Sequence, residues 1–166
     1  MHEDFNKLRM ISKKLVQTAF ALTWQFRIEI EGQPPDFELF VKDLSYCPIE
    51  VPTEEIRVGA QILTYPVAIA PVSVSMTMRE HEDRRIHTWF AEKIQKVLNA
   101  DGTVNLPDGG GKYVMEMKRF SILRDSSEVE TDLWHVYPTK LGDITESVAT
   151  PEHLEFPITF MRFRSL

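Results

Sequence analysis

Alternation of apolar and polar side chains is the clearest pattern along this chain. Between residues 23 and 31 every second side chain is apolar, which is typical of a strand that is buried on one face. A turn-rich segment at 32–36 follows, so residues 37–44 are expected to return as the second strand of a hairpin. The apolar side of the first strand consists of Trp24, Phe26, Ile28 and Ile30.

The same period of two recurs later in the chain. Residues 72–79 alternate, and three further strands are expected at 112–123, 129–138 and 153–164. The strand at 129–138 is expected to end at Pro138, with a short Lys-Leu-Gly turn after it. Trp134 and Tyr137 of this strand are expected to pack in the core. In the first of these strands the inward-pointing side chains are Val72, Val74, Met76 and Met78.

Two segments show a helical period instead. Residues 3–17 carry apolar side chains at helical spacing with the bases on another face, and we expect this helix to pack on a protein partner rather than on a membrane. Residues 80–99 form the stronger amphipathic pattern, with acids at the start and lysines nearer the end. The apolar stripe of the first helix is Phe5, Leu8, Ile11 (or Met10) and Leu15; that of the second is Ile86, Trp89, Phe90, Ile94, Val97 and Leu98.

Residues 45–71 are punctuated by four prolines, so any strands there are short or lie at an edge. Two apolar pieces, 55–58 and 61–67, flank Gly59-Ala60 and are expected to form a projecting hairpin. Because an isolated hairpin is marginal in water, it is expected to bury itself against another subunit.

These elements predict a mainly β (α+β) chain, an antiparallel β-sandwich or barrel with one flanking helix and an N-terminal helix. At 166 residues we expect a single domain over 1–166, with an N-terminal helical extension at 1–20 and a projecting arm at 45–71.

Charge and cysteine content narrow the function. The net charge of −6 opposes tight binding to nucleic-acid phosphates, and residues 125–156 hold eight acids against one base. Cys47 is the single cysteine, so an intrachain disulfide is impossible. No apolar run reaches transmembrane length. We expect the chain to fold in a reducing cytoplasm.

No motif for catalysis stands out. His81 and His87 lack the i, i+4 spacing of a zinc helix, because the i+4 position is Arg85. The glycine run at 109–111 is followed by Lys112-Tyr113 and a strand, not by the helix of a phosphate-binding loop. We therefore expect no enzyme, no metal and no cofactor.

The order of the elements over residues 20–164 resembles the tail-tube subunits of contractile-tailed phages. The segments that carry the resemblance are the strand at 26–30, the stretch at 44–50, Gly59, the strand at 72–78, the charged helix start at 80–85 before Trp89, the segment from Trp134 through Tyr137-Pro138-Thr139-Lys140-Leu141-Gly142, and the alternating last strand.

The resemblance implies a structural subunit that stacks as hexameric rings around a channel for DNA passage, in a virion tail assembled in the host cytoplasm. Its partners would be further copies and sheath, baseplate or tape-measure proteins, with no membrane. Acids lining the channel would repel DNA phosphates. The arm would bury residues against the next ring, and the second helix would lie on the outer wall. The arm candidates are Ile56, Val58, Ile62 and Val67; the outer-helix candidates are Glu82 and Arg85.

Two departures from the tube pattern, the long basic N-terminal helix and the proline-rich arm, leave open a specialised baseplate or initiator tube protein. Related secretion-system and pyocin-like tubes share the fold, so the type of particle is also open. A small-ligand-binding β-barrel is the main alternative, on the alternating strands and aromatic-rich interior. An acid–base enzyme using the region 81–87 is a third.

Overall fold

The structure is a computed structural model that describes residues 2–107 and 112–164. The glycine run at 109–111 lies outside the described residues. The elements, in chain order, are α1 (His2–Gln17), β1 (Phe26–Ile30), the short 3-10 helix η1 (Phe37–Leu39), β2 (Val41–Tyr46), β3 (Thr53–Val58), β4 (Gln61–Pro66), β5 (Ser73–Arg79), α2 (Arg85–Gln95), β6 (Met115–Ile122), β7 (Glu128–Leu141) and β8 (Glu155–Arg162).

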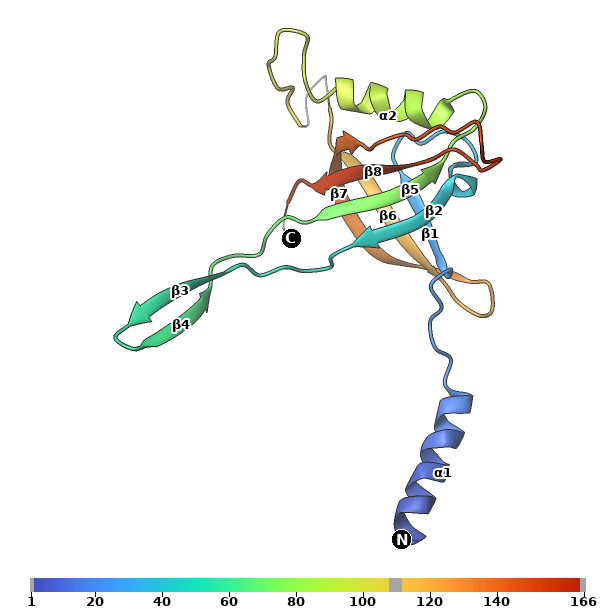
Figure 1. The fold of residues 1–166 in the computed structure, drawn as a ribbon, viewed down its shortest axis with the longest axis vertical. Coiled ribbons are helices and arrows are strands. Elements are labelled where there is room, and N and C mark those ends of the chain that lie inside the picture. Colours follow the sequence, from blue (N-terminus) through green and yellow to red (C-terminus); the bar gives the residue numbers. More distant parts are fainter. Residues whose placement is uncertain (1, 108–111, 165–166) are drawn as a thin grey trace.

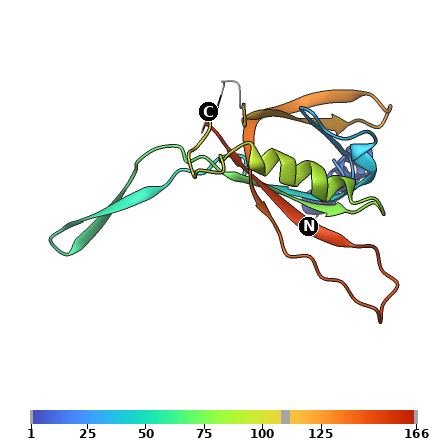
Figure 2. The same cartoon turned by 90° about the horizontal axis from the view of Figure 1, so that it is seen from above.

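Six of the strands form one antiparallel sheet in the order β1-β6-β7-β8-β5-β2, and β3 pairs with β4 alone. The sheet is strongly curved, so that its two edge strands, β1 and β2, approach each other (Figures 1 and 2). The expectation of a mainly β, antiparallel fold with a flanking helix and an N-terminal helix is confirmed.

The expected hairpin between residues 23–31 and 37–44 is wrong, because β1 pairs with β6 and β2 pairs with β5. Asp36 adopts a left-handed φ of 58°, and the chain turns there into η1 instead of a strand. Phe37 of η1 is fully buried, so this segment crosses from one edge of the sheet to the other over the core. An alternating pattern specifies which face of a strand is buried, but not its neighbour.

The core occupies the inner side of the curved sheet. Alternate residues of the strands point into it as their patterns predict, and among the described residues no polar or charged residue is buried. The fully enclosed side chains are Phe37, Phe90, Phe156, Phe160, Ile28, Met76, Met78, Ile86, Met117, Ile158, Val74 and Val136.

Helix α2 packs over one end of this core (Figure 1). Trp89 donates a hydrogen bond from Nε1 to the Gly32 carbonyl at 2.8 Å, and the Phe90 ring meets Phe160 edge-on at a centroid distance of 5.3 Å. A helix that is apolar on one stripe is stabilised mainly by such packing.

The helix expected at 80–99 is shorter at both ends than its pattern predicts. Arg84 adopts a left-handed φ of 57°, and the carboxylate of Glu80 accepts hydrogen bonds from the backbone N–H groups of Ile86 (3.1 Å) and His87 (2.9 Å). Glu80 lies outside the helix but caps it, because its carboxylate accepts hydrogen bonds from backbone N–H groups of the first turn that have no partner within the helix. After Gln95 the chain turns, and Leu98 forms an isolated antiparallel bridge with Val104.

Two aromatic residues expected in the core lie elsewhere. Trp24 is 65% exposed, because it precedes β1 and the alternation no longer fixes its direction. Tyr137 is paired with Met161 on the outer face of the sheet and packs its ring on Tyr113 at a centroid distance of 5.7 Å. Trp134, in contrast, is buried as expected.

Strand β7 continues past Pro138 to Leu141, so the expected strand end at Pro138 is wrong. The register shifts between Pro138 and Lys140, and this bulge accommodates a residue that cannot donate to the ladder. The strand ends where Gly142 donates its N–H to the Pro157 carbonyl at 2.7 Å. The Lys-Leu-Gly segment is therefore the end of a strand and not a turn.

Gly142 leaves no room for a side chain, because a Cβ there would collide with the ring and the carbonyl oxygen of Pro157. We expect Gly142→Ala to lower the free energy of unfolding by about 1–3 kcal/mol, the usual cost of overpacking. Urea denaturation at neutral pH measures this change. The exposed Thr145→Ala in the following loop is the control, and equal midpoints for both variants would contradict the prediction.

Helix α1 and the β3–β4 hairpin both extend away from the sheet, in different directions (Figure 1). Residues 18–25 connect α1 to β1, and every described side chain of α1 is exposed. Over the described residues, no helix combines the length and the apolar character that crossing a membrane requires.

Candidate assembly surfaces

The β3–β4 hairpin, called the arm below, is present as expected. Gly59 begins its two-residue turn with a positive φ of 63°, a conformation that favours glycine and suits tight hairpins. The pairing continues toward the sheet, because Val67 donates its N–H to the Pro52 carbonyl (3.0 Å) and Ala70 to the Glu50 carbonyl (2.9 Å). Every residue of β3 and β4 is exposed, so the arm has no core of its own.

The strand register of the arm shows on which face each of the four candidate residues lies. Ile56 lies opposite Leu63, and Val58 opposite Gln61, so Ile56, Val58 and Leu63 share one face. Ile62 pairs with Arg57 on the other face, and Val67 follows the end of β4. The arm therefore gathers most of its apolar side chains on one face, whereas Ile62 lies among polar side chains on the other.

Sequence reasoning missed two members of the first face, Leu63 and Tyr65. Counting outward from the Gly59-Ala60 turn would have placed Leu63 opposite Ile56. The hydroxyl of Tyr65 donates to the Glu54 carboxylate at 2.6 Å, and this bond raises the pKa of Tyr65 above its ordinary value. The tyrosine ring is thereby held over the same face as Ile56.

A second surface lies between the two edge strands and is called the edge groove below. β1 and β2 each pair with one neighbour, so each presents one row of unpaired backbone groups. The groove between them has a volume of about 450 Å³. Its floor is apolar and partly buried, and two acids and two bases stand at its rim. The principal lining residues are Trp24, Phe26, Val41, Leu44, Arg27, Glu38, Lys42 and Asp43.

The bases of the edge groove are engaged by nearby carboxylates. The Arg27 guanidinium lies 2.7 Å from Glu128, 3.1 Å from Glu29 and 3.9 Å from Glu38. The hydrogen bond to Glu128 is the main cause of a raised Arg27 pKa.

The second base of the edge groove, Lys42, is likewise engaged, with its Nζ 2.7 Å from Glu155. Asp43 has no base within 4.0 Å among the described residues. The groove therefore combines an apolar floor with a rim on which acids and bases are balanced.

The two outer-helix candidates lie at the start of α2, but only one is in it. Arg85 is the first helical residue, and Glu82 lies in the preceding turn, so its expected place within the helix is wrong. The Arg85 guanidinium binds both oxygens of Asp83, at 2.9–3.2 Å. Arg85 is thus engaged by a local carboxylate, whereas Glu82 is exposed.

The hydrogen bonds from Arg85 lower the pKa of Asp83 to about 2. We expect Arg85→Gln to return this pKa toward its ordinary value of 3.8, as followed by NMR titration of the Asp83 side chain. Because the folded pKa is depressed, the stabilisation by this pair is complete above the unfolded value and is lost as pH falls from about 4 to 2. Arg84→Gln, which removes a neighbouring charge, is the control; an unchanged titration in Arg85→Gln would contradict the assignment.

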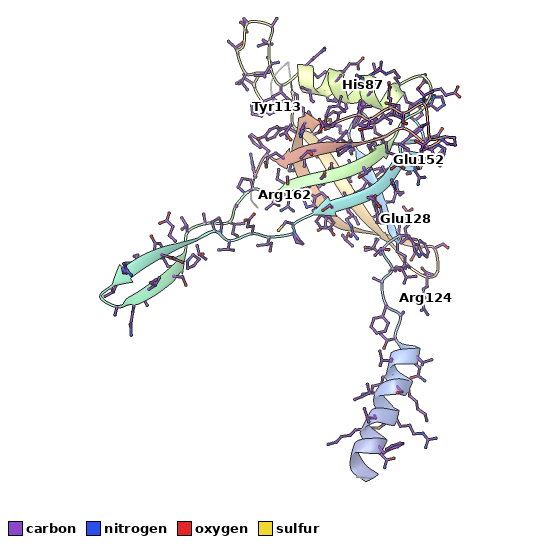
Figure 3. All side chains as sticks on the ribbon, viewed as in Figure 1. His87, Tyr113, Arg124, Glu128, Glu152 and Arg162 are labelled. Carbon is purple, nitrogen blue, oxygen red and sulfur yellow. The ribbon has the colours of Figure 1, made fainter. Side chains whose placement is uncertain are left out.

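Chemical sites are not supported by the geometry of the described residues. His81 Nδ1 lies 2.9 Å from Asp83 before the helix, and His87 is within α2 (Figure 3). Within residues 2–107 and 112–164, no group of three or more His, Cys, Asp or Glu side chains could hold a metal ion. None of the charged side chains in the described residues is buried, so none has the apolar surroundings that raise the pKa of a catalytic acid.

Comparisons with known proteins relate the fold to one kind of assembly. No protein-family model and no curated protein matches the chain. A chain in the sheath–tube complex of the extracellular contractile injection system PVC, in the extended state, superposes with a TM-score of 0.61 at 14% identity, over 92% of this chain and 93% of that chain.

A chain of the tube-terminating cap of the anti-feeding prophage AFP gives a TM-score of 0.63 at 14% identity, with 89% of each chain covered. A chain of the AFP baseplate gives 0.57 at 12% identity, over 87% of this chain and 95% of that chain. Such low identities show a shared fold, and the resemblance in the order of the sequence elements is confirmed at that level. The chain has the tail-tube-type fold of contractile injection systems.

Proposed function

We propose that this chain is a non-enzymatic structural subunit of a contractile tail tube, which stacks as hexameric rings around a central channel. The observation that carries the proposal is the arm: two exposed strands that extend beyond the sheet and carry an apolar face that the described residues of the chain do not cover. An apolar surface of this kind is stable in water only when another molecule buries it.

The two free sheet edges support the same proposal. A closed ring gives each edge strand a neighbour, which removes the hazard of unpaired backbone groups. The similar AFP baseplate structure is described as six-fold symmetrised, and we propose the same ring number here. In the ring, the arm reaches the adjacent ring and buries Ile56, Val58, Ile62 and Val67, while Glu82 and Arg85 lie on the outer side toward a sheath or baseplate partner.

The position along the tube is the next part of the proposal. The similar structures described above come from a sheath–tube complex, a terminating cap and a baseplate, with TM-scores of 0.57–0.63. The long basic helix α1 departs from the expected pattern of a plain tube subunit, which supports a specialised baseplate, initiator or terminal subunit. The net charge of −6 supports a channel through which DNA passes without binding. The proposed location is a virion tail that is assembled in the host cytoplasm.

The alternative, a binding protein for small apolar ligands, has less support. Such a protein needs an apolar cavity in its interior. Here the interior between the sheet and α2 is filled by Phe37, Phe90, Phe160 and Met117, each fully buried. The edge groove lies at the surface instead.

Electron microscopy of the concentrated full chain tests the proposal. We expect six-membered rings and short stacks, with a matching mass in solution by mass photometry. If the chain stays monomeric at every concentration, both alone and mixed with the proposed sheath and baseplate partners, the proposal is wrong. A thermal-shift screen with fatty acids serves as the companion measurement, and a saturable stabilisation there would favour the ligand-binding alternative.

A further inference from the structure

The arm is joined to the sheet by two legs, residues 47–52 before β3 and residues 67–72 after β4. The legs are bonded to each other, because Val67 and Ala70 of the second leg donate their N–H groups to carbonyls of the first. These bonds hold the legs together as a pair, but they do not set the direction in which the pair leaves the sheet. That direction depends on contacts between the legs and the rest of the chain.

One residue of the sheet bonds to both legs. Arg162, the last residue of β8, donates its backbone N–H to the Val72 carbonyl at 3.2 Å and its Nη1 to the Pro48 carbonyl at 3.0 Å. Within residues 2–107 and 112–164, no other residue outside the arm hydrogen-bonds to both legs. Figure 3 shows Arg162 at the end of β8, near the place where the arm leaves the sheet.

Aromatic rings hold the Arg162 guanidinium in place. Its Cζ lies 5.3 Å from the centroid of the Trp134 ring, and Trp134 packs on Tyr46 with 4.9 Å between the centroids. The Arg119 guanidinium lies over the Tyr46 ring at 5.6 Å. Contacts of a guanidinium with an aromatic face are attractive. Because Tyr46 is the last residue of β2, the same set of contacts fixes the point at which the first leg begins.

The charge of Arg162 is not used in an ion pair. No carboxylate lies within 4.0 Å of its guanidinium among the described residues, so the Pro48 carbonyl and the Trp134 ring are its main partners. A hydrogen bond from a charged donor is stronger than one from a neutral donor. Removing the guanidinium therefore releases the first leg without leaving an unpaired acid behind.

We propose that Arg162 is the positioning residue that sets the direction of the arm relative to the sheet, so that the arm is ordered before it meets a neighbouring ring. Ordering a mobile segment on binding costs conformational entropy, and a segment already held in its bound direction avoids that cost. The role in docking rests on the proposed function. The direction of the arm is a property of the single chain and can be measured without assembly.

Double electron–electron resonance measures this direction in the full chain. Nitroxide labels are attached at Ala60→Cys in the turn of the arm and at Thr88→Cys on α2, with Cys47→Ser to remove the native thiol. We expect one narrow distribution of label distances when Arg162 is present. In Arg162→Met the distribution should become about twice as wide, because the freedom of a segment depends on its local contacts.

The measurement is made in chains that also carry Ile56→Lys and Leu63→Lys, so that no neighbouring ring holds the arm. Arg79→Met is the matched control, because it makes the same exchange at the other end of the β5–β8 pair, where Arg79 lies opposite Glu155. It should leave the distribution narrow. Arg162→Lys, which keeps the charge and a donor, should narrow the distribution again relative to Arg162→Met.

Urea denaturation checks that each variant is folded. If Arg162→Met does not fold, Arg162→Gln takes its place, since it also removes the charge and the contact with the Trp134 ring. A distribution as narrow without Arg162 as with it, or equal broadening in Arg79→Met, would overturn the proposal.

Electron micrographs of chains with the unmodified arm face test the consequence for docking. Arg162→Met should shorten the stacks by about half or more, because the arm then has to be ordered on docking. Unchanged stacks in a variant with a wide distribution would overturn the role of Arg162 in docking. If even the unmodified chain forms no assembly, the proposed function is wrong, whereas a widened distribution in Arg162→Met would still support Arg162 as the residue that directs the arm.

Discussion

Phe90→Ala is expected to lower the free energy of unfolding by about 3–5 kcal/mol, the range found when a large aromatic side chain is removed from a core. Phe90 is fully buried between α2 and the sheet. Its ring meets Phe160 of β8 edge-on at 5.3 Å and lies 6.1 Å from Trp89. Removing it leaves a cavity between α2 and the curved sheet.

Urea denaturation followed by circular dichroism measures the loss. Thr88→Ala is the matched control, because Thr88 is exposed on the same helix and its replacement should change the free energy by less than about 0.5 kcal/mol. Phe90→Leu should fall between the two, since it keeps part of the volume. A loss below about 1 kcal/mol in Phe90→Ala would mean that the site collapses around the cavity and that α2 is not held as described.

Much of the fold was readable from periodicity because burial on one face is a local property of a strand. The pattern in residues 72–79 placed Val74, Met76 and Met78 inside β5, and all three are buried. Helix α1 was likewise readable, with bounds at His2 and Gln17.

Strand partners could not be read in the same way, since pairing joins residues that are far apart in the chain. β1 pairs with β6, about ninety residues away as in Phe26 with Ser121, rather than with its neighbour in sequence. The start of α2 was misplaced for another reason: the acids at 80–83 are typical of a first helical turn, although the apolar pattern begins only at Ile86. In the structure the left-handed Arg84 ends the preceding turn, and the Glu80 carboxylate caps the helix from outside it.

The candidate surfaces were predicted in part. The Gly59-Ala60 turn indicated the arm, but the apolar pattern did not show on which face of the arm each residue lies. The strand register shows this, and it places Ile62 and Ile56 on opposite faces. The edge groove could not be predicted at all, because it exists only where β1 and β2, the opposite edges of a six-stranded sheet, come close.

Replacing Ile56 and Leu63 with lysine is expected to stop rings from stacking while the fold of each subunit is kept. Both side chains are about half exposed, at 49% and 54%, so the free energy of unfolding should change by no more than about 0.5 kcal/mol. They lie directly opposite each other on one face of the arm. If that face is buried against the adjacent ring, two lysines there place unpaired charges in an apolar contact, which costs several kcal/mol.

The measurement is the distribution of stack lengths in electron micrographs, with urea denaturation as the check on folding. Thr145→Lys with Ser147→Lys adds the same charge to an exposed loop of the body and should leave the stacks intact. Ile62→Lys tests the opposite face of the arm, and shortening by this variant alone would assign the contact to that face. The arm is proposed to act between rings. Loss of the rings themselves in a folded Ile56→Lys/Leu63→Lys variant would place its contact within a ring and contradict the inter-ring role. Unchanged stacks would show that this face is not buried at all.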